Sequence, residues 1–249
     1  EVDLLGLNAC YYPRSLAFIG ASATPGKWGH TLPSNTLSRK YNGKVFLVNP
    51  RGGTILGKDV YRSITDIEDP IDLAVVTIPA KHVINIIPDL KKKKVKGMLL
   101  ITSGFRETDQ EGARLEKEVV DAANEAGIML LGPNTMGICN PHIDFYCYGS
   151  HAYPNPGSTT LVCQSGNMGV QLLGFAEQQG IGIRSFSGSG NEAMVTIEDY
   201  MEVFEIDKLT RTVVLYLESV KDGERFFRSA ARVSRKKPIV VLKGGRTKI

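Results

Sequence analysis

Short hydrophobic runs alternate with segments of helical periodicity along most of the chain. This alternation is typical of parallel β-strands joined by helices, so the sequence predicts an α/β fold. In the first half, strands are expected at residues 15–20, 44–48, 72–78, 97–102 and 128–131. In the second half, strands are expected at 158–163, 182–186, 211–217 and 238–242, and helices at 167–179, 196–206 and 223–235.

The alternation is interrupted once, at residues 139–157, which are rich in aromatic residues, Pro and Gly and show no period. We therefore expect a Rossmann-like domain at residues 1–140, a connector at 141–157 and a second α/β domain at 158–249. The last segment, KGGRTKI, lacks the helix expected after a strand, and the chain begins with Glu1 rather than Met. Both features suggest part of a longer protein with an incomplete second domain.

Composition narrows the class of protein. The net charge is only +4, which is too small to indicate binding to nucleic acid or to an anionic membrane. Four cysteines without framework spacing fit a reducing compartment, and no segment resembles a signal peptide or a membrane span. We expect a cytoplasmic protein with neither nucleic-acid nor membrane partners.

The loop GASATPGKWG, which follows the first predicted strand, suggests a phosphate-binding turn. It departs from the dinucleotide fingerprint, because Ser22 and Pro25 occupy positions that the fingerprint gives to glycine. After the second strand, an NAD site would carry an acidic residue, whereas this chain has Asn49, Pro50 and Arg51. Lys27 and Arg51 would attract a phosphorylated ribose, which favours NADP or coenzyme A, although solvated loop cations are the simpler alternative.

A series of motifs then follows in order along the chain: GASATPGKWG, VNPRGG, TIPAKH, ITSGFRE, LGPNTMGICNP, CQSGNMG, SGSGNEA, YLES and KPIVVLKGGRT. Together they resemble the NDP-forming acyl-CoA synthetases, which include the alpha subunit of succinyl-CoA synthetase and the ADP-forming acetate–CoA ligases. The resemblance extends from about Arg14 to Arg246. It implies a CoA-binding Rossmann-like domain followed by a truncated flavodoxin-like α/β domain.

The resemblance also implies positions for coenzyme A in the first domain. Its nucleotide end would be held by Gly20, Ala21, Ser22 and Lys27, with Asn49, Pro50 and Arg51 beside them. The adenine and pantetheine path would be bordered by Ile78, Pro79 and Ala80, and the thiol would lie near Ser103, Gly104, Asn134 and Thr135. Small residues suit these positions because they let backbone N–H groups approach phosphate oxygens.

The second domain of the family holds a phosphohistidine, and the resemblance implies two loops that would surround it. The catalytic candidates are Ser165, Gly166 and Asn167 at one helix start, Gly190 near the next strand end, and Glu218, which would orient the histidine. Two helix N-termini facing one point would form an anion site. None of the histidines of this chain (His30, His82, His142 and His151) matches the family motif, so the phosphorylated histidine is expected outside it.

The implied reaction is that of an acid–CoA ligase, ADP- or GDP-forming, which converts acyl-CoA, phosphate and ADP to acid, CoA and ATP through an acyl phosphate. ADP, ATP and Mg would bind a missing ATP-grasp module or subunit, and the protein would be an oligomer. An alternative from another class stays open, because similar CoA-binding regions regulate fused protein lysine acyltransferases.

The expected connector contains a candidate metal site. Cys139, His142, Cys147 and His151 are residue types that suit tetrahedral zinc. Their spacing fits no zinc module, and such residues in aromatic loops usually pack or face solvent. The sequence therefore predicts no metal, with zinc as the open alternative.

Overall fold

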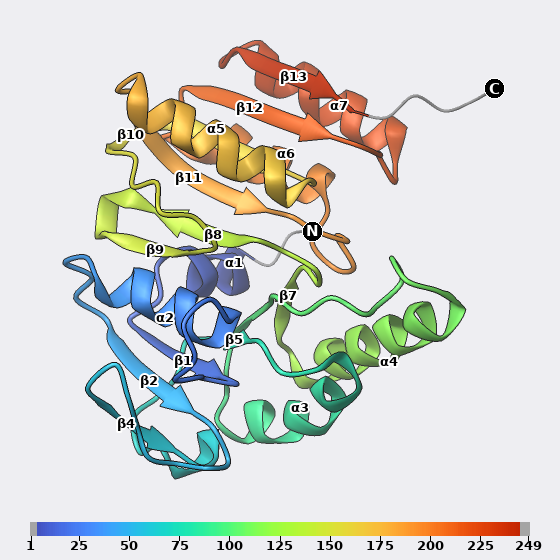
Figure 1. Ribbon diagram of the computed structural model, residues 1–249. Helices are drawn as coiled ribbons and strands as arrows, with labels where there is room; N and C mark the ends of the chain where they lie inside the picture. Colours follow the sequence, from blue (N-terminus) through green and yellow to red (C-terminus); the bar gives the residue numbers. More distant parts are fainter. Residues whose placement is uncertain (1–3, 245–249) are drawn as a thin grey trace.

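Two β-sheets form the framework of the molecule in the computed structural model, which describes residues 4–244. In Figure 1 the first sheet, coloured blue to green, lies below the second, coloured yellow-green to red. Helices pack against both sheets, and the predicted α/β class is confirmed. None of the helices between residues 4 and 244 is long and apolar enough to cross a lipid bilayer.

The first sheet has the strand order β3-β4-β2-β1-β5-β6-β7. Its strands are β1 (Ser15–Ile19), β2 (Lys44–Val48), β3 (Thr54–Ile55), β4 (Lys58–Tyr61), β5 (Leu73–Val76), β6 (Gly97–Leu100) and β7 (Met129–Leu131). All pairings are parallel except that of the β3–β4 hairpin. Apart from β3, this is the Rossmann order, whose topological switch point lies between β1 and β5.

Four α-helices accompany this sheet. They are α1 (Leu4–Tyr11), α2 (Trp28–Leu37), α3 (Val83–Lys92) and α4 (Gln110–Ala126). Helix α4 begins where the Asp109 carboxylate accepts a hydrogen bond from Gly112 N at 2.8 Å, and it ends at Gly127, which has a φ of 68°. Its Val119 and Ala123 are buried against the sheet, which fixes the helix in place.

The second sheet has the order β13-β12-β10-β11-β8-β9. Its strands are β8 (Gly137–Asn140), β9 (Phe145–Tyr148), β10 (Pro156–Cys163), β11 (Ile183–Gly188), β12 (Thr212–Leu217) and β13 (Ile239–Lys243). The parallel part places β10 between β11 and β12, as flavodoxin-like sheets do. Its helices are α5 (Gly166–Gln178), α6 (Ile197–Ile206) and α7 (Gly223–Ser234).

The structure differs from the connector expected at residues 141–157. Strand β9 lies within this segment and pairs antiparallel with β8, which extends the second sheet. All four residues of β9 are buried, so the strand shows no alternation of polar and apolar positions. Asn35 of α2 donates hydrogen bonds to Tyr148 O at 2.7 Å and to Ser150 O at 2.8 Å. The hairpin therefore joins the two sheets, and the proposed domain limits stay a prediction.

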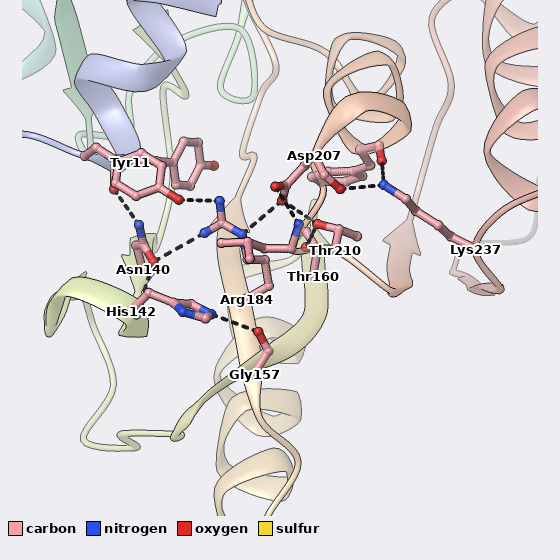
Figure 2. Close-up of polar contacts among 12 residues, drawn as sticks. Tyr11, Asn140, His142, Gly157, Thr160, Arg184, Asp207, Thr210 and Lys237 are labelled. Carbon is pink, nitrogen blue, oxygen red and sulfur yellow. Dashed lines mark hydrogen bonds and ion pairs between the residues drawn. The ribbon is translucent and has the colours of Figure 1, made fainter.

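A buried arginine forms a second link between the two halves (Figure 2). The Arg184 side chain is 8% exposed and its Nε donates to Asp207 Oδ2 at 3.0 Å. Its other guanidinium nitrogens contact Asn140 Oδ1 at 3.4 Å and the hydroxyl of Tyr12. Asn140 in turn donates to Tyr11 O at 2.9 Å, so the end of α1 is attached to the second sheet.

Candidate active site

A cleft of about 520 Å³ lies where the carboxyl ends of strands from both sheets meet. The first sheet contributes residues 77–79 after β5, 101–103 after β6 and 134–136 after β7. The second sheet contributes residues 164–167 after β10 and Glu218 after β12. Ligands of open α/β sheets bind at this edge, outside the carboxyl ends of the strands, and here the corresponding edges of two sheets share one cleft.

The cleft brings together predicted site residues of both domains. Those that line it are Ile78, Pro79, Ser103, Asn134, Thr135, Ser165, Gly166, Asn167 and Glu218. Predicted residues outside its lining are Gly20, Ala21, Ser22, Lys27, Asn49, Pro50, Arg51, Ala80, Gly104 and Gly190. Lining residues that were not predicted are Trp28, Thr77, Ile101, Thr102, Met136 and Gln164, although all six occur in or beside the quoted motifs or strand ends.

The two loops predicted to hold a nucleotide lie side by side. Asn49 Nδ2 donates to Ala21 O at 2.8 Å, and Asn49 Oδ1 accepts from Arg51 N at 2.9 Å. The first bond holds the loop after β2 against the loop after β1, and the second fixes the Asn49 side chain within its own loop. Lys27 and Arg51 are both exposed on these loops, so a phosphate group could approach either cation from solvent.

The turn after β1 requires glycine. Gly20 has a φ of +94°, and a side chain there would approach Thr77 Oγ1 to 2.7 Å. Thr77 uses this hydroxyl to donate to Ile19 O at 3.1 Å and to Gly20 O at 3.2 Å. Gly29, at the start of α2, lies so close to the Gly20 carbonyl that a side chain would overlap it. The helix start is therefore held directly against the turn, as phosphate-binding loops require.

Two cleft residues after β7 have structural partners. The Thr135 hydroxyl donates to Gly188 O and accepts from Gly137 N at 3.0 Å, so it joins the two domains. Asn134 has a φ of 58°, and its side chain contacts Asn191 Oδ1 at 3.4 Å. These hydrogen bonds give Thr135 a structural role, because they hold the wall of the cleft in place.

The N-terminus of α5 opens into the cleft. Ser165 caps this helix, since its hydroxyl accepts from Met168 N at 3.5 Å, and Gly166 and Asn167 form the first turn. The N–H groups of a first turn have no partner within their helix, and the helix dipole places partial positive charge there. This part of the cleft is suited to an anion.

Gln164 fixes the backbone at Glu218, a residue that lines the same cleft. Gln164 Oε1 accepts from the backbone N–H groups of Glu218 at 2.6 Å and Ser219 at 2.9 Å. Its Nε2 donates to Ser219 O at 2.9 Å and to Glu192 Oε1 at 3.0 Å. Glu192 is 2% exposed, and burial raises the pKa of its carboxyl group. A single amide thus fixes the loops after β10 and β12 relative to each other.

The loop of Gly190 corrects the expectation of two helix N-termini around one anion. Helix α6 begins at Ile197, several residues beyond Gly190. Gly190 instead lies against the carbonyl groups of Pro133 and Asn134, where a side chain would overlap them. Asn191 donates to the carboxylates of Glu107 at 2.6 Å and Glu116 at 2.8 Å. This loop therefore contacts the other domain, and among the helices of the second sheet α5 is the one whose N-terminus lines the cleft.

The four candidate zinc ligands do not form one cluster. Cys139 and Cys147 are buried in β8 and β9, and burial raises the pKa of both thiols. His142 Nε2 lies 2.8 Å from Gly157 O, and His151 is exposed. Within residues 4–244, no group of three or more His, Cys, Asp or Glu could hold a metal ion.

Comparison with known proteins identifies both halves of the chain. Residues 14–141 match the family model described as "CoA binding domain". Residues 156–249 match the family model described as "Succinyl-CoA ligase like flavodoxin domain". The two matches follow each other in the order that the sequence motifs indicate.

Similar proteins include several acid–CoA ligases. The chain is 38% identical over 247 residues to "Acetate–CoA ligase [ADP-forming] I subunit alpha" of Pyrococcus furiosus, covering 98% of this chain and 54% of that protein. It is 35% identical to "4-hydroxybutyrate–CoA ligase [ADP-forming]" of Nitrosopumilus maritimus, covering 94% of this chain and 34% of that protein. The chain thus spans about half the length, or less, of these curated relatives.

Solved structures give the same result. The "dinucleotide forming Acetyl-coenzyme A synthetase 1" of Ca. Korarchaeum cryptofilum, in complex with phosphate and ADP, superposes with a TM-score of 0.89 at 33% identity, covering 98% of this chain and 53% of that chain. Because the relatives named are ligases, they give no support to the acyltransferase alternative. The chain belongs to the NDP-forming acyl-CoA synthetase family, with its CoA binding domain followed by its succinyl-CoA-ligase-like flavodoxin domain.

Proposed function

We propose that this chain is the CoA-binding portion of an acid–CoA ligase that interconverts acyl-CoA, phosphate and ADP with acid, CoA and ATP. The observation that carries the proposal is the cleft itself. Loops of the CoA binding domain and the open N-terminus of α5 line one space, so a thioester and a phosphate could meet there. Calorimetric titration of the chain with coenzyme A tests the binding step.

Coenzyme A would extend from the loops after β1 and β2 into the cleft. We propose that Gly20, Ala21, Ser22, Lys27, Asn49, Pro50 and Arg51 hold its nucleotide end. The pantetheine would pass Ile78, Pro79 and Ala80, and the thiol would lie near Ser103, Gly104 and Asn134. The hydrogen bond from Asn49 to Ala21 supports this path, because it holds the loops after β1 and β2 side by side at the carboxyl edge of the sheet.

The first chemical step would be acyl transfer to phosphate. A phosphate oxygen would attack the thioester carbonyl carbon, the C–S bond would break, and CoA would leave as the thiolate and take up a proton. The N-terminal turn of α5, with Ser165, Gly166 and Asn167, would hold the phosphate charge during attack. The product would be an acyl phosphate.

The second step would transfer the phosphoryl group to a histidine and release the acid. His30, His82, His142 and His151 all lie outside the lining of the cleft, so we propose that the histidine comes from elsewhere in the complete enzyme. Glu218 would orient its imidazole and stabilise the positive charge that develops on it. ADP and Mg would bind an ATP-grasp module or partner subunit, which would make the enzyme an assembly of more than this chain.

A Glu218→Gln variant of the complete enzyme should form phosphohistidine about 100-fold more slowly, because the amide lacks the charge that stabilises the imidazolium. Affinity for CoA should be unchanged. The measurement is incorporation of labelled phosphate into protein in the presence of acyl-CoA. Glu224→Gln, at an exposed carboxylate of α7 outside the cleft, is the matched control. Equal labelling of the Glu218→Gln enzyme and the wild type would rule out this role.

A further inference from the structure

Two large apolar side chains form one wall of the cleft. Trp28, at the start of α2, is 40% exposed and lines the cleft together with half-buried Met136. Both approach the same point of the backbone, since a side chain added at Gly149 would overlap the Trp28 ring and lie 3.2 Å from Met136 Cε. The indole and the thioether therefore form one continuous apolar surface.

Glycine allows this wall to approach the backbone at both of its ends. Trp28 packs on Gly149, and Met136 packs on Gly166, where any side chain would overlap Met136 Cγ. Gly149 N also donates to Met136 O at 3.0 Å, which ties the loop that carries Met136 to the β9 end. The Trp28 and Met136 side chains thus pack directly against the backbone of Gly149 and Gly166.

The wall formed by Trp28 and Met136 lies beside the point where acyl transfer would occur. Gly166 is the first residue of α5, so Met136 lies against the helix start where we propose that phosphate binds. During acyl transfer the carbonyl carbon contacts both the thiol sulfur and the attacking phosphate oxygen. The acyl chain, which is attached to this carbon, would therefore start close to Met136.

We infer that Met136 and Trp28 contact the acyl chain of the substrate and limit its size. This inference rests on the proposed function. Among the residues that the structure describes, the lining of the cleft contains no Lys, Arg or His and one carboxylate, Glu218, so a free carboxylate on the acyl group would have no cation partner among them. The substrate class is therefore a compact, uncharged acyl group.

Met136→Ala would open the wall beside the reacting carbon. The measurement is calorimetric titration with CoA, acetyl-CoA and phenylacetyl-CoA. Phosphate is omitted, because acyl transfer cannot occur without it. The affinity for phenylacetyl-CoA relative to acetyl-CoA should rise about tenfold in this variant, while CoA affinity stays within about twofold. Met168→Ala, which removes the same group from a half-buried position outside the cleft, should leave the ratio unchanged.

A variant at Trp28 tests the same prediction without changing how Met136 packs. Trp28→Ala removes an exposed side chain and should also raise the ratio, whereas Met136→Leu preserves volume and should not. An equal loss of affinity for all three ligands would overturn the inference, because it would assign the wall to the pantetheine arm. An unchanged ratio in both alanine variants would overturn it as well. Absence of CoA binding by the wild type would instead refute the proposed function on which the inference depends.

Discussion

Replacing Arg184 by Met should lower the free energy of unfolding by about 3–5 kcal/mol, because it leaves a partly buried carboxylate without its charge partner. The Arg184 and Asp207 side chains are 8% and 19% exposed, respectively. Burial raises the pKa of Asp207, but hydrogen bonds from Thr210 and Leu209 N and the nearby Arg184 outweigh burial and lower it. Asp207 therefore stays ionised at neutral pH, and loss of Arg184 is costly.

Equilibrium unfolding in urea measures this effect. Arg114→Met is the matched control, since Arg114 pairs with Glu111 and Glu118 on the exposed face of α4 and is itself 62% exposed. Surface pairs of this kind contribute less than about 1 kcal/mol. If Arg184→Met and Arg114→Met lower the free energy of unfolding by similar amounts, then the contacts of Arg184 do not stabilise the link between α1 and the second sheet.

Removing both Lys27 and Arg51 by substitution with Ala should weaken CoA binding about 100-fold. Each cation would donate a charge-assisted hydrogen bond to phosphate, which at an exposed site corresponds to about tenfold in affinity. If the two side chains hold the 3′-phosphate, the same variant should bind 3′-dephospho-CoA almost as well as the wild type does. The loss should also become smaller as salt concentration rises.

The control for this double variant removes the same charge elsewhere. Lys91 and Lys92 are exposed at the end of α3, at the edge of the first sheet opposite the carboxyl ends of its strands. Their double Ala variant should bind CoA as the wild type does. If it loses as much affinity as the Lys27 and Arg51 variant, then CoA binding depends on net charge and the proposed phosphate contacts are absent.

The sequence predicts the second half of the fold best. Each of the strands β10 to β13 and the helices between them begins and ends within two residues of its predicted limits. Strands such as β12 (TVVLYL) are short apolar runs, and segments of helical periodicity separate these runs along the chain. The β3–β4 hairpin is too short to produce such a run, and α2 contains Pro33, which breaks the helical pattern.

Topology explains why the candidate site was partly predictable. Residues at strand ends, such as Ser103, Asn134 and Glu218, meet in the cleft because parallel strands end at one edge of each sheet. The structural partners of Thr135 and Gly190 lie far away in sequence, at Gly188 and Pro133 respectively. No local pattern reveals such pairs. Trp28 and Met136 were missed because apolar residues in a motif resemble core residues.

Calorimetric titration of the purified chain with coenzyme A, with NADP and 3′-dephospho-CoA as comparisons, tests the central proposal most directly. Saturable binding of CoA, weaker binding of 3′-dephospho-CoA and still weaker binding of NADP are the expected results. Tighter binding of NADP than of CoA, or no binding of CoA, would contradict the proposal that the loops after β1 and β2 hold the nucleotide end of coenzyme A.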